Sequence, residues 1–278
     1  MLLMFTVTIC YTICSLSDSY AVAKLKFNGN ELTFFMAAAT SLLMLFVLPF
    51  DSRLFVLSWQ SFAAIILMVV SKMLEFQLAA IILRDMSAFE LKAWLGITVF
   101  LSYATDLLTG VSPLGIDTAV KFGFIAVTSA GLFLIARSGN GKIPYKKILL
   151  PLAGYLLSKF GYGMTVKFTQ DSISPTLSLF CALVILAVIL APKTHPIKLI
   201  REKTRGTVFV SVTKIPNVIG LVCENAVAMQ SMANFSFIQP MVLATLFLVG
   251  LIKREGYGRL NIVGGIICII GIVGFQLF

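Results

Sequence analysis

Two ionisable residues lie deep within an apolar stretch of the chain. In the sequence VVSKMLEFQ, Lys72 and Glu75 are three residues apart, inside a run from about 60 to 83 that is otherwise mostly aliphatic and aromatic. A charge at that depth in a membrane is disfavoured by about 2.5–3.5 kcal/mol on insertion scales, so it usually marks a function or a matched partner. Residues three apart share one face of a helix, and we therefore expect Lys72 and Glu75 to act together.

Two further lysines lie at a similar depth. Lys159 and Lys214 are each about eight to twelve residues into an apolar run, where the comparable acids are Asp18 and Glu75. Three lysines against two acids leave one positive charge, which a deprotonated lysine or a bound anion would neutralise. Because lysine recognises phosphate or carboxylate as a point charge, this count predicts a ligand with an anionic group.

A purely structural interpretation of these charges stays open beside the functional one. In it, Lys72 pairs with Glu75, and Lys159 or Lys214 pairs with Asp18, in a buried network that contacts no ligand. In the functional interpretation, the two acids contact a substrate amine or take up and release a proton.

Polar and aromatic side chains in the same runs extend the candidate site, although tyrosines near the ends of spans are often interface anchors. Pro216 removes a backbone donor and is expected to kink its helix, exposing carbonyl groups that could line the site. The expected substrate-binding residues are Asp18, Lys72, Glu75, Gln77, Tyr103, Tyr155, Lys159, Tyr162, Lys214 and Asn217.

The composition defines the elements that must position these residues. The chain has 278 residues, of which 59% are hydrophobic and 12% charged, and its mean hydropathy is +0.98. These values indicate an integral membrane protein. At about 20 apolar residues per crossing, we expect ten helical spans, at 3–23, 31–49, 60–83, 87–108, 114–136, 148–169, 174–192, 206–225, 229–251 and 257–278.

The two halves of the chain share short matching segments. VSKMLEF at 70–76 resembles VTKIPNV at 212–218, which superposes Lys72 on Lys214 and places Asn217 where the first half has Glu75. DMSAF at 85–89 likewise resembles SMANF at 231–235. Such ordered matches favour a duplication.

The number of spans in each half has a geometric consequence. Five spans per half place the second copy in the opposite orientation, so we expect an all-α membrane protein built from two inverted-topology repeats, 1–142 and 143–278. Transporters with this architecture bind substrate near the midplane, where the repeats meet.

Several of these segments resemble one known family. NELTFFMAAATSLLMLFVL at 30–48 and ISPTLSLFCALVILAVIL at 173–190 each begin with a short polar lead before a span rich in small residues, and 228–275 carries Pro240, the turn KREG and a glycine-rich last span. In these features the chain is similar to the EamA family of drug/metabolite transporters. The resemblance implies a ten-helix carrier, in a family whose substrates include amino acids, sugars, sugar phosphates, nucleotides and drugs.

The distribution of Lys and Arg predicts the orientation. These residues gather in the loops after the first, third, fifth, seventh and ninth spans, whereas Arg53 and Lys167 are those of the alternate loops and their flanks. The positive-inside rule then places both termini outside the cell. We expect a multi-pass protein of a bacterial inner (plasma) membrane. Asp106 and Glu224, close to the ends of spans, are expected at the membrane interface.

The favoured function is secondary transport of a small anionic or zwitterionic metabolite by alternating access. The alternatives are an exporter of cationic or aromatic compounds and a non-transporting accessory subunit. The chain has no nucleotide-binding loop, no residue set typical of an intramembrane enzyme and no basic stripe for nucleic acid. We therefore expect no enzyme activity, cofactor, metal or nucleic-acid partner. The expected partners are the lipid bilayer, the metabolite, and a coupling proton or exchange substrate. The glycines of the last span favour close packing of helices within the chain, and a homodimer face is the alternative.

Overall fold

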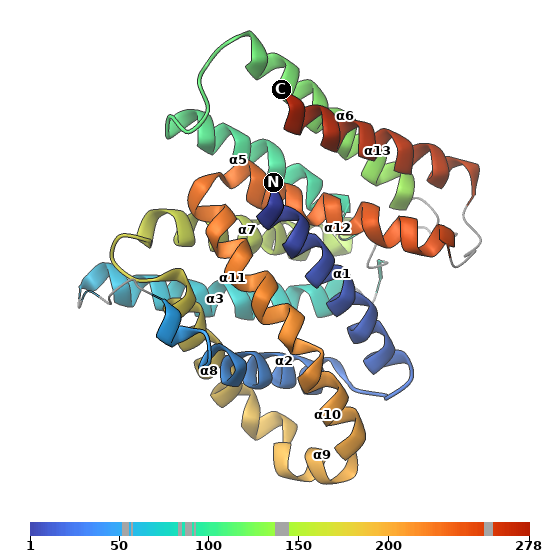
Figure 1. Cartoon of the computed structure of the whole chain (residues 1–278). Helices are drawn as coiled ribbons and strands as arrows, with labels where there is room; N and C mark the ends of the chain where they lie inside the picture. Colours follow the sequence, from blue (N-terminus) through green and yellow to red (C-terminus); the bar gives the residue numbers. More distant parts are fainter. Residues whose placement is uncertain are drawn as a thin grey trace. The chain divides into compact units, whose positions relative to one another are not determined.

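The computed structural model describes residues 1–51, 56, 58–82, 85–86, 91, 93–136, 145–252 and 258–278. Within these ranges the chain is helical, with no strand (Figure 1). The α-helices are α1 (Leu2–Ala23), α2 (Gly29–Met44), α3 (Trp59–Ile82), α5 (Gly96–Leu108), α6 (Ile116–Ala136), α7 (Tyr145–Thr169), α8 (Pro175–Thr194), α9 (Pro196–Glu202), α10 (Thr204–Val212), α11 (Lys214–Gln230), α12 (Met232–Ile252) and α13 (Arg259–Leu277), with a short 3₁₀ turn, η1, at Leu48–Phe50.

Among the residues that the structure describes, six segments are long and apolar enough to cross a membrane: 59–79, 116–135, 175–194, 204–230, 232–252 and 259–277. Leu2–Asp18 and Gly96–Leu108 are shorter apolar helices. The structure therefore confirms an all-helical chain compatible with a membrane-embedded protein. The count of ten transmembrane helices stays a prediction, as do the membrane type and the side on which the termini lie.

The polar leads noted in the sequence are helix caps. Asn28 Oδ1 accepts a hydrogen bond from the Glu31 N–H at 2.8 Å, and Glu31 Oε2 accepts one from the Asn28 N–H at 2.9 Å, which is a capping box at the start of α2. Ser174 Oγ accepts a hydrogen bond from the Thr176 N–H at 3.2 Å and precedes Pro175, the first residue of α8. Each lead thus satisfies backbone donors that the first turn leaves open.

The chain divides into two compact units. Unit 1 comprises 1–76 and 161–229, and unit 2 comprises 77–160 and 230–278. Each unit takes segments from both halves of the sequence, so the units differ from the predicted repeats 1–142 and 143–278. The two units are described separately below.

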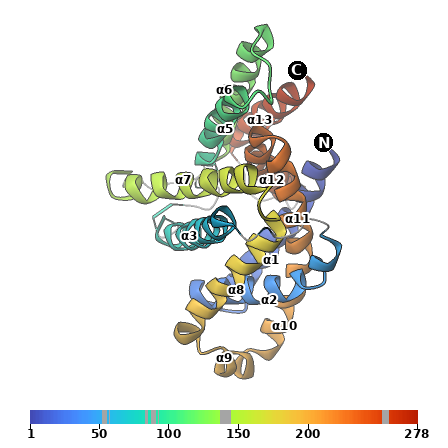
Figure 2. The same cartoon turned by 90° about the vertical axis from the view of Figure 1, so that its left-hand side faces the viewer.

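Unit 1 is built around the packing of α2 against α8, which lie side by side in both views (Figure 2). Its apolar core includes Phe27, Phe34 and Phe35, with edge-to-face contacts between Phe35 and each of the other two rings. Such contacts add about 0.5–1.5 kcal/mol each to the burial of the rings. Leu199 and Val210 from α9 and α10 complete the cluster.

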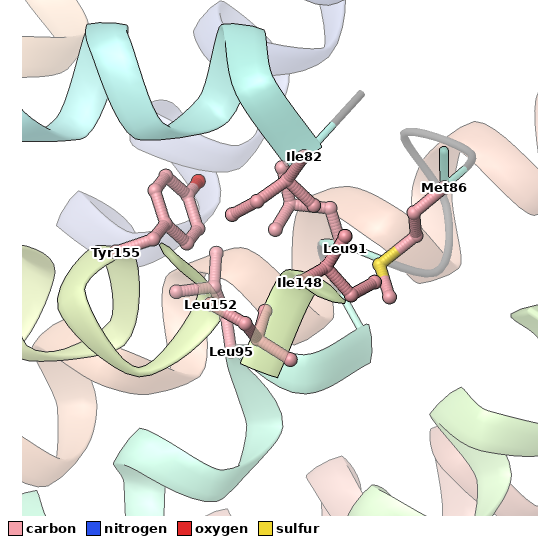
Figure 3. Packing of buried hydrophobic residues seen from close by; sticks show 7 residues of the cluster. All are labelled: Ile82, Met86, Leu91, Leu95, Ile148, Leu152 and Tyr155. Atoms are coloured by element: carbon pink, nitrogen blue, oxygen red, sulfur yellow. The ribbon is translucent and has the colours of Figure 1, made fainter. Parts of the chain in front are cut away.

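Unit 2 has an apolar cluster that joins the end of α3 to α7. Ile82, Leu152 and Tyr155 point toward one another, and Met86 and Leu95 lie in the same cluster (Figure 3). The Trp94 ring packs beside this cluster and meets Phe133 of α6 edge-on.

Helices α6 and α13 of unit 2 pack closely along their glycines (Figure 1). A Cβ atom on Gly131 would lie 2.4 Å from the Cys268 backbone nitrogen, and one on Gly271 would lie 2.6 Å from the Thr128 backbone nitrogen. Small residues allow this approach of two backbones. The glycine face of α13 thus packs inside the chain, and the homodimer stays a prediction.

Three helix pairs join counterparts of the predicted repeat. Helix α2 packs against α8 within unit 1, and α5 against α12 and α6 against α13 within unit 2. The two members of each pair come from different sequence halves and hold the same place in the order of predicted spans. Internal pairing of this kind is what a duplicated chain would give, although the inverted repeat itself stays a prediction.

Candidate ligand-binding site

Lys72 and Glu75 form an ion pair in unit 1. Lys72 Nζ donates a hydrogen bond to Glu75 Oε2 at 3.1 Å, across one turn of α3, and both side chains are largely buried. The same ammonium lies 4.3 Å from the centre of the Tyr162 ring on α7. A cation over an aromatic face is stabilised by about 2 kcal/mol when desolvated, so Tyr162 fixes the lysine from a second helix.

A second ion pair joins α11 to α1. The fully buried Lys214 Nζ donates a hydrogen bond to Asp18 Oδ1 at 2.6 Å. Lys72–Glu75 and Lys214–Asp18 are two of the pairs that the structural interpretation predicted, and both contacts are confirmed.

A helix break positions Lys214. Helix α10 ends at Val212 and α11 begins at Lys214, so Pro216 falls in the first turn of α11, where its missing N–H has least effect. The Thr213 carbonyl at the break accepts a hydrogen bond from the Cys14 thiol at 3.6 Å. One residue beyond the proline, Asn217 Nδ2 donates to Thr40 Oγ1 at 3.1 Å.

Glu224 is a buried acid of unit 1, and its expected position at the membrane interface stays a prediction. Its side chain is 2% exposed, and Oε2 accepts a hydrogen bond from the Tyr11 hydroxyl of α1. The predicted span stopped at Asn225, whereas α11 continues to Gln230. Glu224 is therefore well inside the helix, and Tyr11 is the partner that sequence spacing alone could not identify.

Asn225, the residue after Glu224, links α11 to α7. Its Oδ1 accepts a hydrogen bond from the Tyr162 hydroxyl at 2.6 Å. Tyr162 therefore contacts Lys72 with its ring and Asn225 with its hydroxyl. Tyr162 thus links the Lys72–Glu75 pair of α3 to Asn225 of α11.

We call this group of residues in unit 1 the polar cluster: Tyr11, Asp18, Lys72, Glu75, Tyr162, Lys214, Glu224 and Asn225. It draws α1 and α3 from one sequence half and α7 and α11 from the other. With Glu224 included, it holds three acids and two lysines. The predicted excess of positive charge counted Lys159, which lies in unit 2, and left out Glu224, so this cluster does not have that excess.

The other four predicted site residues belong to unit 2. Tyr155 is part of the apolar cluster of Figure 3, and Tyr103 lies edge-on to Phe122 and Phe275, with ring centres 5.0 and 5.7 Å away. Lys159 is half-buried on α7, and Gln77 is exposed on α3. Their part in binding stays a prediction.

Asp106 in unit 2 has a structural environment of a different kind. This fully buried carboxylate accepts hydrogen bonds from Ser231 Oγ at 2.7 Å and from the backbone N–H groups of Met232 and Ala233, both at 2.9 Å. It caps the first turn of α12, where a negative charge is favoured by the helix dipole. The expected position of Asp106 at the membrane interface stays a prediction.

No three His, Cys, Asp or Glu side chains within the described ranges are grouped so that they could hold a metal ion. The polar cluster offers instead ammonium, amide and hydroxyl donors beside carboxylate acceptors. Such a set can recognise a small molecule that carries charges of both signs.

Comparison with known proteins adds no relative: no protein-family model matches the chain, and no curated protein matches it.

Proposed function

We propose that this protein is a secondary transporter that moves a small zwitterionic or anionic metabolite across a membrane by alternating access. The observation that carries the proposal is that two buried lysines, Lys72 and Lys214, each pair with a carboxylate, Glu75 and Asp18 respectively. Six helices among the described residues are apolar enough to cross a membrane. Ionisable residues in such helices are disfavoured unless they are paired or used.

The composition of the polar cluster supports a carrier rather than a rigid scaffold. Its residues come from four helices, two in each sequence half, as expected where two repeats meet around a midplane site. The sequence resemblance to the EamA family of drug/metabolite transporters points the same way. In this proposal, the chain follows the ten-helix inverted plan, and a proton or an exchange substrate drives the cycle.

Binding to the purified protein tests the ligand class. The protein is screened by thermal shift against sugar phosphates, nucleotides, carboxylates, amino acids and amines. We expect compounds with an anionic group to stabilise it. Proteoliposomes that contain the protein should then take up the same compounds. If only amines or lipophilic cations stabilise the protein, the anionic or zwitterionic class is rejected. If no compound that binds is taken up, transport itself is rejected.

A second candidate is an exporter of cationic or aromatic compounds. It is favoured by Glu224, which gives the polar cluster one acid more than it has lysines, and by Tyr11 and Tyr162, whose rings could stack on a planar substrate. The same screen separates the two candidates, because a lipophilic cation without a carboxylate binds only in this second case.

A further inference from the structure

Asn225 carries a buried hydrogen-bond donor that the fold does not use. The residue is 2% exposed, and Nδ2 has no partner among the residues that the structure describes. A buried polar group left without a partner is disfavoured by about 1–3 kcal/mol, and native proteins retain few of them. Each such group calls for an explanation, and a ligand acceptor is one.

The surroundings of Asn225 fix which end of its amide is available. The Tyr162 hydroxyl donates to Oδ1 at 2.6 Å, which assigns the oxygen to Tyr162 and leaves the NH₂ group to donate elsewhere. Tyr162 is itself held by Lys72, whose ammonium lies 4.3 Å from the ring centre. The Lys72 ammonium and the Asn225 amide thus contact the same tyrosine, the first at its ring and the second at its hydroxyl.

We propose that Asn225 Nδ2 donates a hydrogen bond to a carboxylate oxygen of the transported molecule, and that this molecule is a zwitterion whose amine is received by Glu224. The proposal rests on the proposed transport function and specifies its substrate class.

The charges around Asn225 argue for a zwitterion. The group that meets Nδ2 must be an acceptor, and Lys72 favours a negative one. However, Glu224 is the neighbouring residue and Glu75 acts on the same tyrosine, so a doubly charged phosphate would meet two carboxylates. A single carboxylate with an ammonium group nearby matches both signs of charge. Glu224, one residue before Asn225 on α11 and held by the Tyr11 hydroxyl, is the acid that we assign to that ammonium.

Matched variants separate a ligand contact from a structural one. Asn225→Leu combined with Tyr162→Phe removes both partners of one buried hydrogen bond, a change that is close to neutral for folding. The control is Asn261→Leu in α13, since Asn261 is also buried but fully used: Nδ2 donates to the Ile135 carbonyl at 2.8 Å and Oδ1 accepts from the Gly258 N–H at 2.9 Å.

The experiment measures thermal stability and binding of amino acids, with phenylalanine and leucine as probes and phenethylamine and isoamylamine as their analogues without a carboxylate. We expect the wild type to bind an amino acid and to bind its amine analogue at least about tenfold more weakly. The Asn225→Leu/Tyr162→Phe variant should bind the amino acid about 10- to 100-fold more weakly than the wild type, and its thermal stability should be nearly unchanged. Asn261→Leu should show the opposite behaviour: lower stability and unchanged affinity.

Three outcomes overturn the inference: no amino acid binds the wild type, the amine analogue binds as tightly as the amino acid, or the Asn225 variant keeps its affinity. Proteoliposome uptake distinguishes these from failure of the proposed function. If sugar phosphates or nucleotides are taken up and amino acids are not, transport stands and the zwitterion inference falls.

Discussion

Carboxylates inside the helical packing are held in different ways in the two units. In unit 1, Glu75, Asp18 and Glu224 are bound by other side chains, namely Lys72, Lys214 and the Tyr11 hydroxyl. In unit 2, Asp106 is bound largely by backbone N–H groups at the start of α12. Side-chain partners can change rotamer and be replaced by a ligand, whereas backbone donors of a helix are fixed. The difference indicates that unit 1 carries the adaptable polar site and unit 2 a structural one.

The glycines of the two units reinforce this contrast. In unit 2, glycines of α6 and α13 let two backbones meet. In unit 1, Gly220 faces the Tyr11 ring, and a Cβ atom there would lie 2.7 Å from that ring. The small residue in unit 1 therefore makes room for a member of the polar cluster, and those in unit 2 make room for a neighbouring helix.

The largest expected loss of stability comes from breaking a buried ion pair of unit 1. Glu75→Leu leaves the Lys72 ammonium without its carboxylate, and removal of one member of a buried pair is destabilising by about 3–5 kcal/mol. Lys72→Met combined with Glu75→Leu should recover most of that loss. Thermal unfolding in detergent measures both, and a double variant no more stable than Glu75→Leu would contradict the pairing.

The second-largest loss of stability is expected where α6 packs against α13 in unit 2. Gly131→Ala places a Cβ atom against the Cys268 backbone, which cannot move aside as a side chain can, and overpacking of this kind is destabilising by about 3 kcal/mol. Gly123→Ala is the matched control on the same helix, because no atom lies within 4 Å of the added Cβ. It should leave stability unchanged or raise it by about 0.5–1 kcal/mol. Equal effects of the two substitutions would reject close packing of α6 on α13.

A smaller loss of stability is expected on replacement of Asp106, the buried carboxylate of unit 2. Asp106→Ala removes the acceptor of Ser231 Oγ and of two backbone N–H groups, so stability should fall by about 2 kcal/mol. Ligand affinity of the folded protein should stay the same. Thermal unfolding and binding measured on one preparation check both statements, and a loss of affinity would show that the contrast between the units is wrong.

The smallest loss of stability is expected at an uncharged hydrogen-bonded pair of unit 2, Ser102 and Ser236. Ser102 Oγ and Ser236 Oγ are buried and 2.5 Å apart. Ser102→Ala should lower the free energy of unfolding by about 1 kcal/mol, and adding Ser236→Ala should restore part of it. Calorimetry of the single and double variants would contradict this if the double variant were the less stable.

Much of the helical plan could be predicted from the sequence. Apolar runs mark the helices because a membrane accepts only segments that satisfy their own backbone groups. The i, i+3 spacing of Lys72 and Glu75 was enough to predict their ion pair. For Asp18, the sequence left Lys159 and Lys214 as candidate partners, and the structure pairs it with Lys214.

Other features depend on tertiary structure and could not be read from the sequence. The polar role of Glu224 depends on where α11 ends, and helix ends are uncertain by a few residues. The contact from Tyr11 to Glu224 joins positions far apart in sequence and has no local signal. Tyr103 and Tyr155 show the converse limit: a tyrosine in an apolar run suits a binding site or a core, and here both are packed in unit 2.

The most direct test of the account is uptake into proteoliposomes by a variant whose buried pair is replaced but whose fold is kept. Lys72→Met/Glu75→Leu should reduce uptake of a substrate at least about tenfold. Ser102→Ala/Ser236→Ala, the matched replacement in unit 2, should transport at the wild-type rate. If the Lys72→Met/Glu75→Leu variant is folded and transports as fast as the wild type, the polar cluster is a structural ion-pair network and its assignment as the ligand site is contradicted.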